Sequence, residues 1–166
     1  MATPVYRSQT PFTDKGSATL VVTCGSNAFA PYVREFLERH LALPEGTYDS
    51  LAVPGGPQFL LLTEYLPKFA WAGHRWVKFL VEHHRLRRAV LVGHEDCAWH
   101  DDERMIPALL HRLAAGPAGP DSGKDRQLEG LRQMARALHE LLPSLAVEAY
   151  FAGKEPDGRV GFLRVD

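Results

Sequence analysis

Three residues of the kinds that bind metal ions stand at the ends of apolar runs in this sequence. Cys24 closes the run 18–23, and His94 and Cys97 follow the run 88–93 with two residues between them. Thiolate and imidazole are preferred ligands of zinc, and a catalytic zinc site uses three protein ligands and keeps the fourth position open. The pattern therefore predicts a Zn²⁺ site made by Cys24, His94 and Cys97.

Two other interpretations of the cysteines stay open at this point. A free cysteine is often buried as a small apolar side chain, and a thiolate at the start of a helix can act as a nucleophile without a metal. A structural disulfide is not expected in a reducing cytosol. The position of Cys24, His94 and Cys97 at predicted strand ends favours the metal site.

Strands and helices alternate along the chain. Apolar runs rich in β-branched residues predict strands over 18–24, 48–54 and 88–93, and Asp157-Gly158 predicts the turn of a closing hairpin made by 144–153 and 159–165. The fold class is therefore α/β: a single domain with a mainly parallel central sheet, helices on both faces and a C-terminal antiparallel edge strand. Sites in such sheets lie beyond the carboxyl ends of the strands, where the three candidate ligands stand.

Apolar residues at helical spacing predict four helices, over 31–41, 64–85, 103–115 and 124–142. Three of these helices carry stripes that we expect to face the sheet: Val33, Phe36, Leu37 and Leu41; Leu66, Phe69, Trp76, Phe79 and Leu80; and Leu128, Leu131, Met134, Leu138 and Leu141. The three tryptophans, Trp71, Trp76 and Trp99, are interpreted as core or subunit-contact residues. Trp99 is also close enough in sequence to His94 and Cys97 to line a pocket beside them.

The composition is that of an ordinary globular protein. The 166 residues are 45% hydrophobic and 23% charged, and 19 basic residues against 20 acidic ones give a formal net charge of −1. We expect an N-terminal arm over 1–16 and one domain over 17–166. Neither nucleic acid nor a membrane is expected as a partner, and the basic segment 74–88 is interpreted as a solvated helix face. Without a signal peptide, the expected location is the cytoplasm.

The segments around the ligands resemble the β-class carbonic anhydrases, zinc lyases that interconvert carbon dioxide and bicarbonate. In that family a first strand ends in Cys-x-Asp-x-Arg and a later strand ends in Gly-His-x-x-Cys; "VVTCGSNAFAP" and "VLVGHEDCAWH" stand in those places here, and "VEAYFAGKEPDGRVGFLRV" is similar to the closing hairpin. The resemblance implies that Cys24, His94 and Cys97 bind Zn²⁺. It also implies a CO2- or bicarbonate-like small-molecule substrate and a homodimer or higher homo-oligomer.

The sequence departs from the family pattern beside the expected open position. Ser26 stands where the family has its aspartate, Ala28 where it has its arginine, and Val53–Gly56 where it has Arg-Asn-Ala-Gly. In the family the arginine holds the carboxylate off the metal, and the aspartate orients the zinc-bound water. We therefore expect a zinc-dependent lyase or hydrolase that acts on a small CO2-like substrate through zinc-bound water, rather than a standard carbonate dehydratase. The alternative is a non-catalytic, zinc-stabilised binding or assembly protein of the same fold.

Other polar residues lie close to the ligands in sequence. Ser26 and Asn27 are candidates to hydrogen-bond a ligand near the open position, although an N-cap or plain turn role is also open. Asp96 and His100 could act as base or fourth ligand. Residues 101–103 (Asp-Asp-Glu) are expected to complement the N-terminal dipole of the next helix, and the Pro-Gly-Gly-Pro segment 54–57 is expected to be a strand-exit turn lining the metal cleft.

Overall fold

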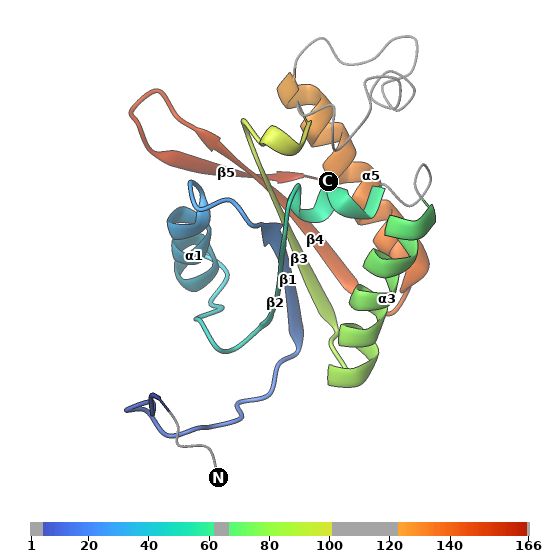
Figure 1. The fold of residues 1–166 in the computed structure, drawn as a ribbon. Coiled ribbons are helices and arrows are strands. Elements are labelled where there is room, and N and C mark those ends of the chain that lie inside the picture. The colour runs from blue at the N-terminus through green and yellow to red at the C-terminus, as the bar shows by residue number, and fades with distance from the viewer. Residues whose placement is uncertain (1–4, 62–66, 101–122, 166) are drawn as a thin grey trace.

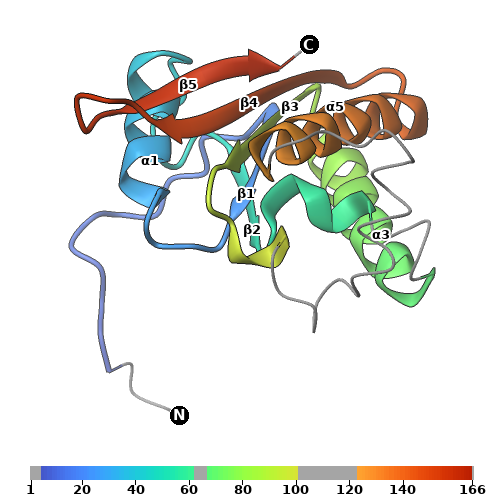
Figure 2. The same cartoon turned by 90° about the horizontal axis from the view of Figure 1, so that it is seen from above.

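A five-stranded sheet forms the centre of the molecule (Figures 1 and 2). The computed structural model describes residues 5–61, 67–100 and 123–165. The strand order is β2-β1-β3-β4-β5, with parallel pairing except between β4 and β5. This is the predicted α/β fold with an antiparallel C-terminal pair. The strands are β1 (Thr19–Cys24), β2 (Asp49–Val53), β3 (Arg88–His94), β4 (Ala146–Lys154) and β5 (Val160–Val165).

Helices cover both faces of the sheet, as predicted. Helix α1 (Ala30–Arg39) lies on one face, and α3 (Pro67–His84) and α5 (Gly123–Leu141) lie on the other (Figure 1). Two short 3₁₀ helices that the sequence did not predict, η1 (Gly56–Leu61) and η2 (Ala98–His100), follow the carboxyl ends of β2 and β3. The helix expected over 103–115 lies outside the described residues.

The neighbouring inner strands β1 and β3 are buried on both faces. In β1 and β3, Leu20, Val22 and Leu91 pack with the residues that contact α3 and α5, whereas Val21 and Val90 pack with those around α1. All five are at most 1% exposed. A continuous apolar run is the sequence signature of such a strand, which explains why both strands are recognisable from sequence.

The packing faces of α1 and α5 agree with the predicted stripes. Val33, Phe36 and Leu37 of α1 are buried, and the ring of Phe36 stacks on Phe162 of β5 with centroids 4.2 Å apart. On α5 the buried apolar residues are Leu131, Met134 and Leu138, while Leu141 at the last turn is 38% exposed.

The prediction for α3 was wrong for two residues of its stripe, whereas Leu80 packs against the core as expected. The side chains of Leu66, Phe69 and Trp71 lie outside the described residues. Trp76 and Phe79, expected on the buried stripe, are 52% and 59% exposed, and Val77 and Val81 are buried in their place. The buried residues follow an i, i+4 row, and Phe79 instead stacks on His83 with centroids 5.0 Å apart. Helical spacing placed both aromatic residues on the stripe, but the core contacts Val77 and Val81 instead.

The described N-terminal residues extend away from the sheet (Figure 1). Residues 5–17 include no helix or strand, and Val5, Tyr6 and Phe12 are 106%, 76% and 94% exposed. These three side chains therefore gain no burial from this single chain. Within the described ranges, no helix combines the length and apolar character needed to span a membrane.

Candidate metal centre

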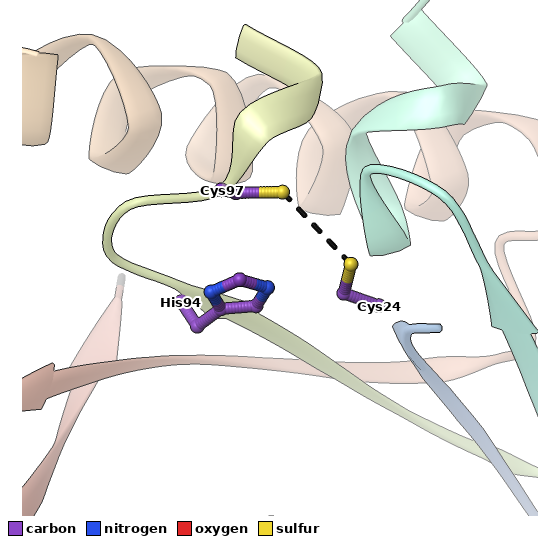
Figure 3. A group of neighbouring side chains, drawn as sticks. All are labelled: Cys24, His94 and Cys97. Atoms are coloured by element: carbon purple, nitrogen blue, oxygen red, sulfur yellow. Dashed lines mark hydrogen bonds between the residues drawn. The ribbon is translucent and has the colours of Figure 1, made fainter. Parts of the chain in front are cut away.

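The three predicted ligands converge at the carboxyl edge of the sheet (Figure 3). Cys24 ends β1, His94 ends β3, and Cys97 follows the turn after β3. The Sγ atoms of the cysteines are 3.9 Å apart, and the donor atoms of all three residues lie within 4.8 Å of one another. Among the described residues, this is the one group of three or more His, Cys, Asp or Glu donors that could hold a metal ion.

The spacing of the two sulfurs fits zinc. With a Zn–S distance of about 2.3 Å, two thiolates of a tetrahedral site lie about 3.8 Å apart, close to the 3.9 Å between Cys24 and Cys97. A disulfide would need about 2.0 Å, and both cysteines are free. The pair is therefore spaced as two ligands of one ion.

The imidazole of His94 presents the correct nitrogen. Its Nδ1 donates to the backbone carbonyl of Glu95 at 2.7 Å, which leaves Nε2 as the ligand atom. This Nε2 is buried and has no hydrogen-bond partner. Phe29, the residue before α1, stacks on the ring with centroids 4.6 Å apart and holds its plane. A buried ring nitrogen without a hydrogen-bond partner is costly, and a metal ion bound to the neutral ring would satisfy it.

The cysteines share one proton in the absence of metal. The Cys97 thiol donates to Cys24, and this bond, with His94 and backbone hydrogen bonds from Ser26 and Gly55, lowers the pKa of Cys24 to about 3 against the opposing effect of burial. The same bond, with burial, raises the pKa of Cys97. The site therefore already stabilises one thiolate, and binding a second thiolate to zinc would release a proton.

The pKa of His94 is raised beside this thiolate. Burial lowers the pKa of His94, but the attraction of Cys24, the hydrogen bond to the Glu95 carbonyl and the charge of Asp96 together outweigh it and raise the pKa. Metal binding would therefore displace a proton from this ring as well.

The turn between His94 and Cys97 is tied to the closing hairpin. Asp96 has a left-handed backbone (φ +52°), which Asp tolerates better than most residues. Lys154 at the end of β4 binds the turn twice: its backbone N–H donates to Glu95 Oε1 at 2.7 Å, and its Nζ donates to Asp96 Oδ2 at 2.6 Å. No local signal in the sequence indicated this bracing, because Lys154 is 58 residues from Asp96.

Asp96 and His100 do not join the ligand group. The Asp96 carboxylate is fully exposed, and its bond to Lys154 lowers its pKa. The Nε2 of His100 donates to Gln58 Oε1, and Gln58 Nε2 in turn donates to the Gln127 carbonyl at 2.9 Å. Within the described part of the chain, no fourth protein ligand approaches the three donors. Asp101, Asp102 and Glu103 lie outside the described residues.

Ser26 and Asn27 lie in the turn between β1 and α1. Ser26 is half-buried and its Oγ accepts the Ala28 N–H at 3.4 Å, a turn interaction, whereas Asn27 is exposed. The N-cap role considered for them is not observed, because the N-cap of α1 is Phe29 and it makes no side-chain cap bond. Cys24 accordingly ends β1, well before α1, and does not lie at a helix N-terminus.

Two residues that the sequence did not single out as site residues, Gly55 and Trp99, pack beside the cysteines. Gly55 makes backbone hydrogen bonds to both Cys24 and Cys97, and Trp99 is 7% exposed and lies against Gly55. The segment 54–57 is thus a turn beside the ligands, as predicted, and it continues into η1. Paired glycines directly after a strand were the available signal, since glycine permits close backbone approach.

Comparison with solved structures shows that the chain has the fold of the β-carbonic anhydrases. It is similar to a carbonic anhydrase from Streptococcus mutans, with TM-score 0.57 and 18% identity over 95% of this chain and 87% of that one. A β-carbonic anhydrase isoform from Trichomonas vaginalis gives 0.54 and 14% over 95% and 88%. A tetrameric β-carbonic anhydrase from Sordaria macrospora gives 0.51 and 15% over 89% and 81%. No family model matches the sequence, and no curated protein does.

The low pKa of Cys24 predicts an unusual pH dependence of its alkylation. In metal-free protein, the rate of Cys24 modification by iodoacetamide should be flat from about pH 5 to about pH 8, because the thiolate is present throughout. An ordinary thiol with a pKa of about 8.5 gains about tenfold per pH unit in that range. Peptide mass spectrometry measures the rate at each cysteine.

Replacing the donor gives the control for this measurement. In Cys97→Ser the sulfur donor is lost, so the pKa of Cys24 should rise and its alkylation should become steeper with pH. A wild-type rate that rises tenfold per unit from pH 5 would contradict the assigned thiolate.

Proposed function

We propose that this chain is a zinc protein of the β-carbonic anhydrase type, in which Cys24, His94 and Cys97 hold Zn²⁺. One observation carries the proposal: the buried, unpaired Nε2 of His94 lies within 4.8 Å of two sulfurs that are themselves 3.9 Å apart. These are the atoms, and the tautomer, that a two-thiolate, one-imidazole zinc site requires.

The proposed activity is hydration or hydrolysis of a small CO2-like electrophile. Bound zinc would acidify a water molecule in the fourth position and so supply a nucleophile near neutral pH. The chain's own contribution is to fix the His94 ring between Phe29 and the Glu95 carbonyl. We also propose that Ser26 and Asn27, in the turn after β1, lie beside the open position and would hydrogen-bond substrate. Neither of these two side chains is a carboxylate base.

The same departure from the family supports a second candidate. A serine at 26 and an alanine at 28 provide neither the carboxylate nor the guanidinium that serves the reaction in the family. A non-catalytic binding or assembly protein, stabilised by zinc, would tolerate this loss. The two candidates differ in the occupant of the fourth position, which is exchangeable in the first and supplied by protein in the second.

We further propose that the chain is a homodimer or a higher homo-oligomer. Val5, Tyr6 and Phe12 of the N-terminal arm are almost fully exposed, as are large parts of Trp76 and Phe79 on α3. Burial of large apolar side chains in an interface is favourable. In addition, a similar solved structure is tetrameric. The two free thiols suit a reducing compartment, which supports the cytoplasm as the location.

Zinc analysis tests the ligand assignment. We expect about one zinc per chain, loss of that zinc in Cys97→Ser, and full retention in His83→Asn, which replaces an exposed histidine of α3. Removing zinc should lower stability by about 4 kcal/mol at a free zinc concentration about 1,000-fold above Kd, or about 10 °C in Tm for a chain of this size. Retention of zinc by Cys97→Ser would contradict the assignment.

Stopped-flow CO2 hydration tests the reaction. We expect zinc-loaded protein to exceed the buffer rate, and the double variant Ser26→Asp with Ala28→Arg to exceed the unaltered protein by about 10²-fold, because a positioned general base contributes about 10²–10⁴-fold. Ala28→Arg alone is the matched control and should give no such gain. An unaltered protein that carries zinc but only matches the buffer would contradict the catalytic proposal and favour the binding protein.

Light scattering on a sizing column tests the oligomer. The mass should be at least twice the 18.5 kDa of the chain, and replacing Tyr6 and Phe12 by serine should lower it, since the arm would lose its apolar contacts. Serine at the exposed Tyr32 of α1 is the control. An unaltered protein that elutes as a monomer at micromolar concentration would rule out the proposed assembly.

A further inference from the structure

Gly55 lies against the indole of Trp99, and its backbone also hydrogen-bonds the ligand sulfurs. Its backbone is left-handed (φ +78°), and a β-carbon at this position would lie only 2.6–2.7 Å from the Cγ, Cδ1 and Cδ2 atoms of Trp99. Three ring atoms at nearly equal distance mean that the indole lies flat over the glycine. Gly55 is buried, and Trp99 is 7% exposed, so the contact is shielded from water.

The backbone of Gly55 takes part in hydrogen bonds to both ligand sulfurs. Cys24 receives backbone hydrogen bonds from Ser26, two residues later in the chain, and from Gly55. Cys97 likewise receives them from Trp99, two residues later, and from Gly55. Among the described residues, Gly55 is the one backbone group that serves both sulfurs. The next residue is equally constrained: a β-carbon on Gly56 would lie 2.9 Å from the Cys24 nitrogen.

The contact links the turns that follow β2 and β3, which the hydrogen bond from His100 to Gln58 also joins. Trp99 belongs to η2, directly after the ligand turn of β3, and Gly55 belongs to the turn after β2. The strand β2 pairs only with β1, at the edge of the sheet. The indole contacts Gly55 directly, whereas the hydrogen bond of His100 is made to Gln58, three residues later.

We propose that Trp99 is a positioning residue that presses Gly55 against the cysteine pair, so that one N–H is shared by both ligand sulfurs of the metal centre. The inference rests on the proposed zinc site. Two thiolates neutralise the charge of Zn²⁺ and so weaken it as a Lewis acid. Hydrogen bonds to the sulfurs draw charge away from the metal, which is the tuning role of groups outside the ligand shell. The contact would therefore make the bound zinc a stronger Lewis acid, in a chain that has Ser26 where the family pattern has its acidic residue.

Gly55→Ala tests the contact, with Gly46→Ala as its matched control. Both glycines have a left-handed backbone, at φ +78° and +83°, but a β-carbon on Gly46 meets nothing within 4 Å. Zinc affinity, measured against a chromophoric chelator, should fall about 10–100-fold in Gly55→Ala and stay unchanged in Gly46→Ala. In the cobalt-substituted protein, the sulfur-to-metal charge-transfer band should shift to lower energy in Gly55→Ala only, because unbonded thiolates are better electron donors.

Variants at Trp99 complete the test. Trp99→Ala should reproduce both the spectral shift and the loss of zinc affinity expected in Gly55→Ala. Trp99→Phe, which keeps a flat ring, should retain most of the wild-type zinc affinity. In the Trp99→Ala background, Gly55→Ala should cost much less than in the wild type, because the two variants remove one interaction. Gly55→Ala with wild-type affinity and spectrum, or losses that simply add, would overturn the contact's role and leave the zinc site intact. If the unaltered protein bound neither zinc nor cobalt, the proposed function would fail and the inference with it.

Discussion

The candidate site depends on the parallel pairing of β1 with β3. Thr23 pairs with Val92, so Cys24 and His94 leave the sheet together at one edge. The two ligands reach the site from opposite faces: Cys24 packs with the residues near α3 and α5, and His94 stacks on Phe29 at the start of α1. Because side chains alternate along a strand, a slip of one residue would exchange these faces and separate the donors. The buried apolar rows of β1 and β3 prevent that slip.

A second constraint is the burial of charge. A thiolate at Cys24 and an imidazole at His94 sit where water is scarce, and such groups are tolerated only when they are paired and hydrogen-bonded. The chain meets this need with backbone groups of the two ligand turns, with Gly55, and with the bracing of Asp96 by Lys154. Each of these partners comes from a segment beyond a strand end. The site is therefore a product of the sheet edge as a whole rather than of one local motif.

The sequence predicted what periodicity and residue type determine locally. Buried strands, the stripes of α1 and α5, and the three candidate ligands were all recognisable, because each leaves a pattern within a few residues. The exposure of Trp76 and Phe79 on α3 was not, since these two residues are as apolar as the residues that pack. Two contacts were also not predictable. Lys154 and Asp96 are 58 positions apart in the sequence, and Trp99 contacts Gly55 from a different turn at the edge of the sheet. Such contacts follow from topology and leave no trace in local spacing.

The central claim is that the chain offers zinc three ligands and leaves the fourth position to a small molecule. X-ray absorption at the zinc edge, recorded with and without excess bromide, tests it most directly. We predict two sulfurs at about 2.3 Å and lighter ligands at about 2.0 Å, with one light ligand replaced when bromide is added. A spectrum that bromide leaves unchanged, fitted by four protein ligands, would contradict it.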